Sequence, residues 1–509
     1  MSSNHLSGTH RNAARHIVVR SAFVLNKGNL GGRVVSGAGF TLLGIVLRTL
    51  LTIGSMSILA RLLTPADFGY IAMAAVVTEF AGLLNSFGLA NILIQRRVVS
   101  RVQLDTVFWA SLLIGGVITL LVFGISFASG WLFADEVTGD LLRVLCLTFL
   151  FGSLATVHEA LISRLMRFRI EFWIQICTIV IRSIVAIILA YQGFGVWSLV
   201  AGAITGSIVG PVLLLIAVPY LPRFRFHLRY LISSWKASGS YMGNTVIYYV
   251  SMNVDIFLIG RQLGAQALGY YQNARSLSDD VRGRIAMPLQ RVLFPALSAL
   301  QDDQARLQQS VLRCARLLAA IICPIGFGLA AISSDLVPVL YGDQWLAMIP
   351  ILSMLGVSAA LRGSTAIASS LFNSQNKVGL GFRYNLAGMI LLVVSVLLTL
   401  PHGLTSVAAV ISANALFSVL TLRVSFGLIA LGTGDIINVL LRPILASCAM
   451  WGCILLLQQN LASSPLHVSL KLLLDIAFGA LVYSLFLHLL SRQYLAEFRE
   501  LSRRLLRAH

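Results

Sequence analysis

The chain has 509 residues, of which 57% are hydrophobic and only 11% are charged, and its mean hydropathy is +0.86. A soluble protein of this length would form several domains, but this composition excludes that class and is typical of a polytopic membrane protein. The formal net charge of +19 does not indicate a nucleic-acid partner, because the basic residues lie mainly between apolar segments, where they set membrane topology.

Residues 1–35 form a basic tail that we expect to lie in the cytoplasm. This stretch has no short apolar core followed by small residues, so we expect no cleavable signal peptide. The first apolar segment, from about Ser36 to Leu63, is too long for a signal peptide and should remain in the protein as its first helix.

Apolar segments of about 18–25 residues recur along the chain, which is the length that an α-helix needs to cross a bilayer. They predict an all-α polytopic membrane protein with about 14 transmembrane helices. The segments are centred near residues 50, 82, 117, 152, 182, 208, 250, 280, 325, 360, 390, 416, 447 and 479.

The connections between these segments differ in charge on the two sides of the membrane. If the N-terminus is cytoplasmic, arginines and lysines concentrate in the connections on the cytoplasmic side. The other connections are short and neutral or acidic, as in "WLFADEVTGD" (131–140) and "SSDLVPVLYGDQ" (333–344). The positive-inside rule therefore predicts that both termini are cytoplasmic.

Two stretches of the chain match each other at an offset of 200 residues: "ARLLTPADFGY" (60–70) and "GRQLGAQALGY" (260–270). Six apolar segments separate them, so both have the same orientation, and we predict two parallel six-helix repeats. A chance match between Gly- and Leu-rich helices is the alternative. The predicted domains are an N-lobe with helices 1–6 (36–221), a cytoplasmic linker (222–236), a C-lobe with helices 7–12 (237–430), helices 13–14 without a repeat partner (431–490) and a basic cytoplasmic tail (491–509).

The stretch "YQNARSLSDDVRGR" (271–284) is rich in charge although apolar runs flank it. At the 200-residue offset Asp279 matches Glu79 of helix 2, so this stretch should be part of helix 8 and not a loop. Arg275 and Asp279 then lie on one helical face. Such charges are too costly to face lipid, so they must line a polar cavity or pair inside the protein.

Other predicted helices carry polar stripes that we expect to converge on one central cavity between the two lobes. Arginine is informative there, because its guanidinium group binds phosphate through two parallel hydrogen bonds and stays charged. The candidate substrate-binding residues are Arg48, Arg275, Arg284, Arg362, Tyr248 and Asn244. Since arginines outnumber acidic residues along helices 1, 8 and 10, an anionic cargo is expected; structural ion pairs are the alternative.

Some cavity candidates have plainer interpretations. Glu159 and Arg182, on adjacent helices, either line the cavity or form an ion pair. His158 is expected to pack between helices. Tyr248, Tyr249 and Tyr271 would suit sugar stacking, but core or interface packing is the more frequent role of any one tyrosine.

Nothing in the sequence indicates catalysis, and we expect no enzyme, no metal and no bound cofactor. The six cysteines lie in apolar segments without a CxxC spacing, and there is no Walker A lysine motif. Transport could still be coupled to H⁺ or Na⁺. Glu79, Asp255 and Asp279 are the candidate ion-coupling residues.

Four stretches resemble one known family in the same order along the chain. They are "ARLLTPADFGYIAMAAVVTEFAGLLNSFGLANILIQR" (60–96), "LISRLMRFR" (161–169), "GFGVWSLVAG" (193–202) and "GYYQNARSL" (269–277). The family is the polysaccharide transporters, or Wzx-type flippases, of the multidrug/oligosaccharidyl-lipid/polysaccharide (MOP) superfamily. The subgroup of colanic acid and exopolysaccharide exporters is the most similar, and the resemblance covers roughly residues 36–430.

This resemblance implies two six-helix lobes, arranged as in multidrug transporters of the MATE type, around a central cavity that opens alternately to each side. It implies that the cargo is an undecaprenyl-diphosphate-linked oligosaccharide, which crosses the bacterial inner membrane for exopolysaccharide or lipopolysaccharide biosynthesis. Other polysaccharide assembly proteins are implied as partners. Cationic residues would hold the diphosphate, and by position these are Arg48, Arg275 and Arg284.

Two other functions stay open at this point. A multidrug or cation antiporter on the same scaffold should have a net acidic cavity. A membrane-embedded polysaccharide polymerase would usually need a larger loop on the outer side than the sequence contains.

Overall fold

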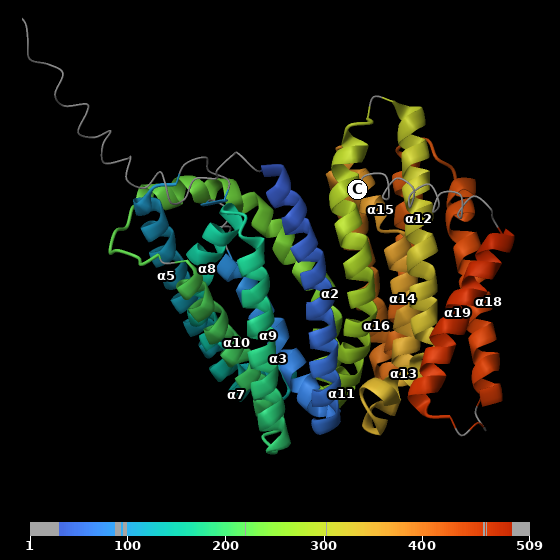
Figure 1. Cartoon of the computed structure of the whole chain (residues 1–509), viewed down its shortest axis with the longest axis horizontal. Coiled ribbons are helices and arrows are strands. Elements are labelled where there is room, and N and C mark those ends of the chain that lie inside the picture. Colours follow the sequence, from blue (N-terminus) through green and yellow to red (C-terminus); the bar gives the residue numbers. More distant parts are fainter. Residues whose placement is uncertain are drawn as a thin grey trace, which may run out of the picture. The chain divides into compact units, whose positions relative to one another are not determined.

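The computed structural model describes residues 30–86, 93–94, 99–218, 220–301, 303–461, 464 and 466–490 (Figure 1). Within these residues the secondary structure is entirely helical, and no strand is present. The side chains of residues 30–42 and of many residues between 228 and 296 lie outside the description. The all-α fold predicted from the sequence is confirmed.

The chain forms two compact units that divide between Asn253 and Val254. Before α11 the first unit contains α2 (Leu30–Leu62), α3 (Pro65–Ser86), α5 (Arg101–Ser126), α6 (Ser129–Phe133), α7 (Val137–Leu145), α8 (Leu147–Arg164), α9 (Phe168–Tyr191) and α10 (Val196–Ala217).

The helix α11 (Leu228–Ser298) runs across the division between the units and bends at Gly264. There φ is 80°, in the left-handed region that glycine adopts without the steric cost that a Cβ would bring. The bend separates the stretches that the sequence predicts as helices 7 and 8, so the charged run 271–284 is helical, as predicted. The helix begins within the predicted linker 222–236.

The second unit continues with a long series of helices and two short 3₁₀ turns. These are α12 (Gln304–Ala331), α13 (Ser333–Leu340), η2 (Asp343–Met348), α14 (Ile349–Ser364), α15 (Ile367–Ser374), α16 (Val378–Thr399), η3 (Leu400–His402), α17 (Leu404–Gly427), α18 (Thr433–Leu461) and α19 (Val468–Leu490).

Twelve helical segments of the described chain are long and apolar enough to cross a membrane. They match predicted helices 1–6 and 9–14, whereas helices 7 and 8 fall in α11. No span is found among the described residues of α11, so the count of fourteen is not confirmed.

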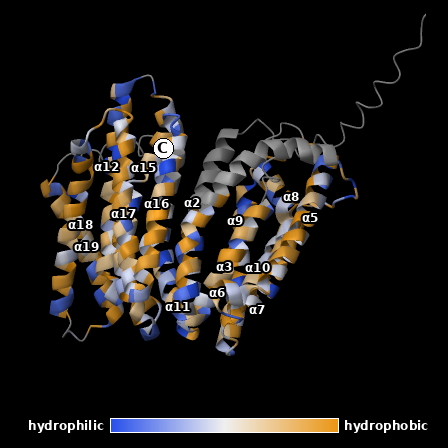
Figure 2. Cartoon of the chain, turned by 180° about the vertical axis from the view of Figure 1, so that it is seen from behind, coloured by the Kyte–Doolittle hydropathy of each residue, from blue (hydrophilic) through white to orange (hydrophobic). Residues whose placement is uncertain are grey.

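Hydrophobic residues predominate along most of these helices (Figure 2), and many of their large apolar side chains are exposed. Leu120, Ile216 and Leu489 are each more than 70% exposed. A soluble protein rarely exposes so much apolar surface, whereas a bilayer accommodates it.

Small residues bring neighbouring helices into close contact within each unit. In the first unit, a Cβ added to Gly202 of α10 would lie 3.0 Å from the Cβ of Ala186 and 3.1 Å from the carbonyl oxygen of Arg182, both on α9. In the second unit, a Cβ on Gly326 of α12 would lie 2.6 Å from the carbonyl oxygen of Gly356 on α14. Van der Waals contact between such surfaces is a main force that holds membrane helices together.

The variant Gly326→Ala is therefore expected to lower the free energy of unfolding by about 1–3 kcal/mol, as overpacking does. Its new methyl group would clash with the backbone of α14 and with Ala360. Thermal unfolding of the purified protein in detergent measures the effect.

The variant Gly328→Ala is the matched control on the same helix. Its methyl group would lie 3.6 Å from Met450, which is an ordinary contact, so its stability should equal or exceed that of the wild type. Equal unfolding temperatures for the two variants would contradict the close packing of α12 on α14.

Candidate functional site

The first unit contains a cavity of about 610 Å³, here called the N-lobe cavity. Helices α2, α8, α9 and α10 line it, and the small residues Gly206 and Gly210 of α10 form part of its wall. The volume is within the range of small-molecule sites. Its polar and charged lining residues are Arg48, Glu159, Ser163, Glu171, Gln175, Thr178 and Ser207.

Arg48 is held in the N-lobe cavity by hydrogen bonds. Its Nε donates to the carbonyl oxygen of Gly44 at 3.0 Å, one turn earlier on α2, and its Nη1 donates to Oε1 of Gln175 on α9. Gln175 in turn donates from Nε2 to Oε1 of Glu171 at 3.1 Å. A neutral amide thus lies between the guanidinium group and the carboxylate.

Two carboxyl groups line the N-lobe cavity, those of Glu159 and Glu171, against the single guanidinium group of Arg48. The lining residues of this cavity therefore carry no excess of positive charge, while the cationic cavity between the two lobes stays a prediction. Glu171 was not foreseen from the sequence. The sequence does contain an indication of it, because Glu171 is four residues before the candidate polar residue Gln175 and so shares its face of α9.

The structure also describes Glu159, Arg182 and His158, for which packing or ion pairing was the alternative to a role in the cavity. No ion pair joins Glu159 to Arg182 in the described part of the chain; Arg182 is exposed, and its aliphatic part packs near Gly206. His158 is fully buried, with ring nitrogens 3.2 Å and 3.1 Å from the carbonyl oxygens of Leu154 and Tyr220. It connects α8 to the segment that follows α10, as expected of a packing residue.

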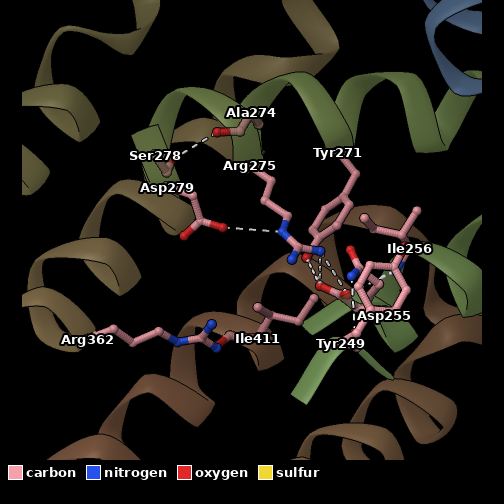
Figure 3. A network of polar contacts seen from close by, with 11 residues as sticks. Tyr249, Asp255, Ile256, Tyr271, Ala274, Arg275, Ser278, Asp279, Arg362 and Ile411 are labelled. Atoms are coloured by element: carbon pink, nitrogen blue, oxygen red, sulfur yellow. Dashed lines mark hydrogen bonds and ion pairs between the residues drawn. The ribbon is translucent and has the colours of Figure 1, made fainter. Parts of the chain in front are cut away.

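The second unit contains a polar cluster on both sides of the bend in α11, here called the C-lobe network (Figure 3). Nη1 of Arg275 lies 2.9 Å and 3.0 Å from the two carboxylate oxygens of Asp255. Nε of Arg275 donates to Asp279 at 3.3 Å. The hydroxyl group of Tyr271 donates to Oδ2 of Asp255 at 2.5 Å, and the backbone N–H of Ile256 donates to its Oδ1 at 3.0 Å.

The C-lobe network neutralises the charge of Arg275 with two carboxylates. Asp255 is 6% exposed and Tyr271 is 1% exposed, so Tyr271 is a core residue and cannot stack on a sugar. Arg362 of α14 extends beside the network, and its Nη2 donates to the carbonyl oxygen of Ile411 at 3.3 Å (Figure 3). A contact of Arg275 or Arg362 with a diphosphate stays a prediction.

Of the remaining candidates, the structure describes the side chains of Glu79 and Tyr249. Glu79 lies exposed on α3. Tyr249 donates to the carbonyl oxygen of Val76 at 2.8 Å, which ties the first part of α11 to α3. The side chains of Asn244, Tyr248 and Arg284 lie outside the described residues.

The variant Asp255→Asn is expected to destabilise the protein by about 3–5 kcal/mol, because removing one partner of a buried ion pair leaves the other charge buried. The side chains of Arg275 and Asp255 are only 17% and 8% exposed. Thermal unfolding in detergent measures the loss.

The variant Asp279→Asn is the control, since this carboxylate contacts the same guanidinium group but is 38% exposed. It should cost at most about 1 kcal/mol. If both variants were equally stable, the pairing of Arg275 with Asp255 could not be the contact that holds the network.

Known proteins resemble this chain in both sequence and structure. It is 25% identical over 363 residues to the lipopolysaccharide biosynthesis protein WzxC of Escherichia coli, covering 70% of this chain and 73% of that protein. It is 27% identical over 307 residues to the succinoglycan biosynthesis transport protein ExoT of Rhizobium meliloti, covering 60% of this chain and 62% of that protein. The teichuronic acid biosynthesis protein TuaB of Bacillus subtilis is 23% identical over 465 residues, 89% of this chain and 94% of its own length.

Two solved structures have the same fold. The lipid II flippase MurJ in an inward closed conformation gives a TM-score of 0.68, at 16% identity, over 91% of this chain and all of that chain. An inward-facing multidrug transporter of the MATE family, also of the MOP superfamily, gives 0.60 at 14% identity over 75% and 94%. This chain therefore shares the fold of these two transporters, as the sequence resemblance implied.

A family described as polysaccharide biosynthesis protein matches residues 58–350, which is more than half of the chain. The resemblance drawn from the four sequence stretches is thereby confirmed. Together with twelve apolar helices, the match shows that this chain is a multi-pass membrane protein and a member of the polysaccharide biosynthesis protein family.

Proposed function

We propose that this protein is a flippase, and not an enzyme, that moves a lipid-linked oligosaccharide repeat unit across the membrane for exopolysaccharide or lipopolysaccharide biosynthesis. The observation that carries the proposal is the family match over residues 58–350. The fold shared with a lipid II flippase over 91% of the chain supports it.

The carrier lipid that we propose is undecaprenyl diphosphate, with the diphosphate bound through Arg48. A guanidinium group binds phosphate oxygens in bidentate fashion and keeps its charge at any physiological pH. Arg48 donates to the neutral amide of Gln175. A phosphate group could therefore replace this amide as the acceptor without breaking an ion pair. Carboxylates such as Glu159 and Glu171 accept hydrogen bonds from sugar hydroxyl groups in the same cavity.

The membrane that we propose is the bacterial inner membrane, with both termini in the cytoplasm. The basic connections of the sequence support this orientation through the positive-inside rule. Other polysaccharide assembly proteins are proposed partners, because a flipped repeat unit must next be polymerised.

The proposed mechanism is alternating access, in which the two lobes move against each other and expose the cargo first to one side and then to the other. The membrane potential, negative inside, favours movement of the anionic cargo out of the cytoplasm. The gain is about 2.3 kcal/mol per elementary charge per 100 mV. A diphosphate with two charges would gain about twice that.

A multidrug or cation antiporter remains the second candidate function, and one observation favours it. The N-lobe cavity holds two carboxyl groups and one guanidinium group, which is the balance of charge that suits a cationic cargo. The MATE-type structure shows that this fold also occurs in multidrug transporters.

The variant Arg48→Ala tests the flippase proposal. We expect the lipid-linked repeat unit to accumulate on the cytoplasmic leaflet and polymer output to fall at least about tenfold, because an unpaired phosphate charge costs about 2–5 kcal/mol. Arg48→Lys should give an intermediate loss, since it keeps the charge but not the bidentate geometry. Carrier-linked sugars are measured by extraction and mass spectrometry.

The control is Arg143→Ala, which removes an arginine from an exposed ion pair with Asp140 on α7 and should leave polymer output unchanged. Membrane levels of all variants are compared first. Normal polymer output from Arg48→Ala at the wild-type protein level would exclude this arginine as the diphosphate ligand. Resistance to cationic drugs conferred by the wild type would favour the antiporter instead.

Coupling to H⁺ or Na⁺ is proposed through Glu79, Asp255 or Asp279. Each is replaced by its amide, and transport into vesicles is measured with and without an imposed gradient of either ion. One amide variant is expected to transport at the same rate in both conditions. If every variant keeps the wild-type dependence on the gradient, these three residues are not the coupling site.

A further inference from the structure

A fully buried carboxyl group lies in the C-terminal helices of the second unit, outside both sites described above. Asp475 of α19 is 0% exposed. Its Oδ2 accepts a hydrogen bond at 2.7 Å from Nε2 of Gln458 on α18. The same amide nitrogen lies 3.3 Å from the carbonyl oxygen of Ala331, at the end of α12.

The other carboxylate oxygen of Asp475, Oδ1, has no donor in the part of the chain that the structure describes. Among the described residues its Oδ1 is buried and accepts no hydrogen bond from an N–H or hydroxyl group. A buried acceptor without a partner costs free energy, and a buried carboxylate without one costs more. The group that can relieve this cost is the carboxyl of Asp335, in the first turn of α13, which is within hydrogen-bonding reach of Asp475.

Two carboxylates cannot satisfy each other, because an ionised carboxylate only accepts hydrogen bonds. One carboxyl group must keep its proton to donate to the other. When two such groups share a site, their charges repel and one pKa rises strongly.

The charged surroundings do not remove the need for this proton. Lys471, one turn before Asp475 on α19, is the cation that acts on Asp335. The adjoining turns 320–331 of α12, 349–361 of α14 and 450–461 of α18 contain no charged residue. Asp335 is the only charged residue of α13, and η2, which packs against α13, contains the exposed Asp343. One cation therefore faces two carboxyl groups. Burial and the Asp475 carboxyl raise the pKa of Asp335 above its ordinary value, and Lys471 opposes them.

We propose that Asp335 and Asp475 form a proton-binding site, in which one shared proton links α13 to the pair of helices α18 and α19. A metal ion is a poorer occupant, since no group of three or more His, Cys, Asp or Glu residues suited to a metal occurs in the described part of the chain. Loss of the proton places two adjacent negative charges where α13 packs against α19. This site does not depend on the cargo assigned above.

The variant Asp335→Asn tests the proposal, because an amide donates the same hydrogen bond but does not titrate. A carboxyl group whose pKa is raised in the folded protein stabilises the fold at low pH and loses that contribution as pH rises through the raised value. The wild type and the variant should therefore unfold at similar temperatures near about pH 5, and the variant should unfold about 2–4 °C higher at about pH 9.

The control is Asp343→Asn, an exposed aspartate at the start of η2, whose difference from the wild type should not change with pH. A difference between Asp335→Asn and the wild type that stays flat across the pH range would overturn the proposal. So would a difference that follows the Na⁺ concentration at constant pH, since it would indicate a bound cation.

Infrared spectroscopy gives a second readout that does not depend on stability. The wild type at neutral pH should show the carbonyl band of a protonated carboxyl group, and Asp335→Asn should lack it. Asp475→Asn should lack it too if that variant folds, whereas a band unchanged in Asp335→Asn would mean that the proton lies elsewhere. Neither measurement uses transport, so a failure here leaves the flippase proposal untouched.

Discussion

The cost of placing an unpartnered charge in an apolar surrounding determines where the polar groups of this protein lie. Within a bilayer no water is available to a stranded charge, so each one needs a partner inside the protein. The C-lobe network shows the complete solution, since the carboxylate of Asp255 receives donors from Tyr271, Arg275 and a backbone N–H, and Asp279 adds a second anion to Arg275. Such a site is stable because its charges already satisfy each other.

The N-lobe cavity meets the same requirement differently, and the difference bears on function. The partner that the structure shows for Arg48 on the neighbouring helix is the neutral amide of Gln175. A ligand that displaces an amide gives up a neutral hydrogen bond, whereas a ligand that displaces Asp255 from Arg275 must also separate two buried charges. Of the two arginines, Arg48 is thus the one that an incoming phosphate can engage at the lower cost.

Periodicity and length predicted the helices well, but not the partners of their polar side chains. The spacing of Arg275 and Asp279 correctly placed both on one face of a helix. The pairing of Arg275 with Asp255 could not be predicted, because those residues are 20 positions apart and meet only because the chain bends at Gly264. Counting arginines along helices likewise could not show that Glu171 lies in the N-lobe cavity, and the cationic cavity predicted between the lobes stays a prediction.

The last two helices lack a partner in the internal repeat, and their attachment combines two kinds of contact. Apolar side chains such as Met450, Ile454 and Tyr483 pack with α12 and α14 in one buried cluster, and this burial supplies most of the attractive free energy. Apolar contacts alone would tolerate small rotations of α19 about its axis. The hydrogen bond of Gln458 to Asp475 does not, because rotating the buried Asp475 away would break the bond that its Oδ2 accepts, so the polar contact selects one orientation of the helix.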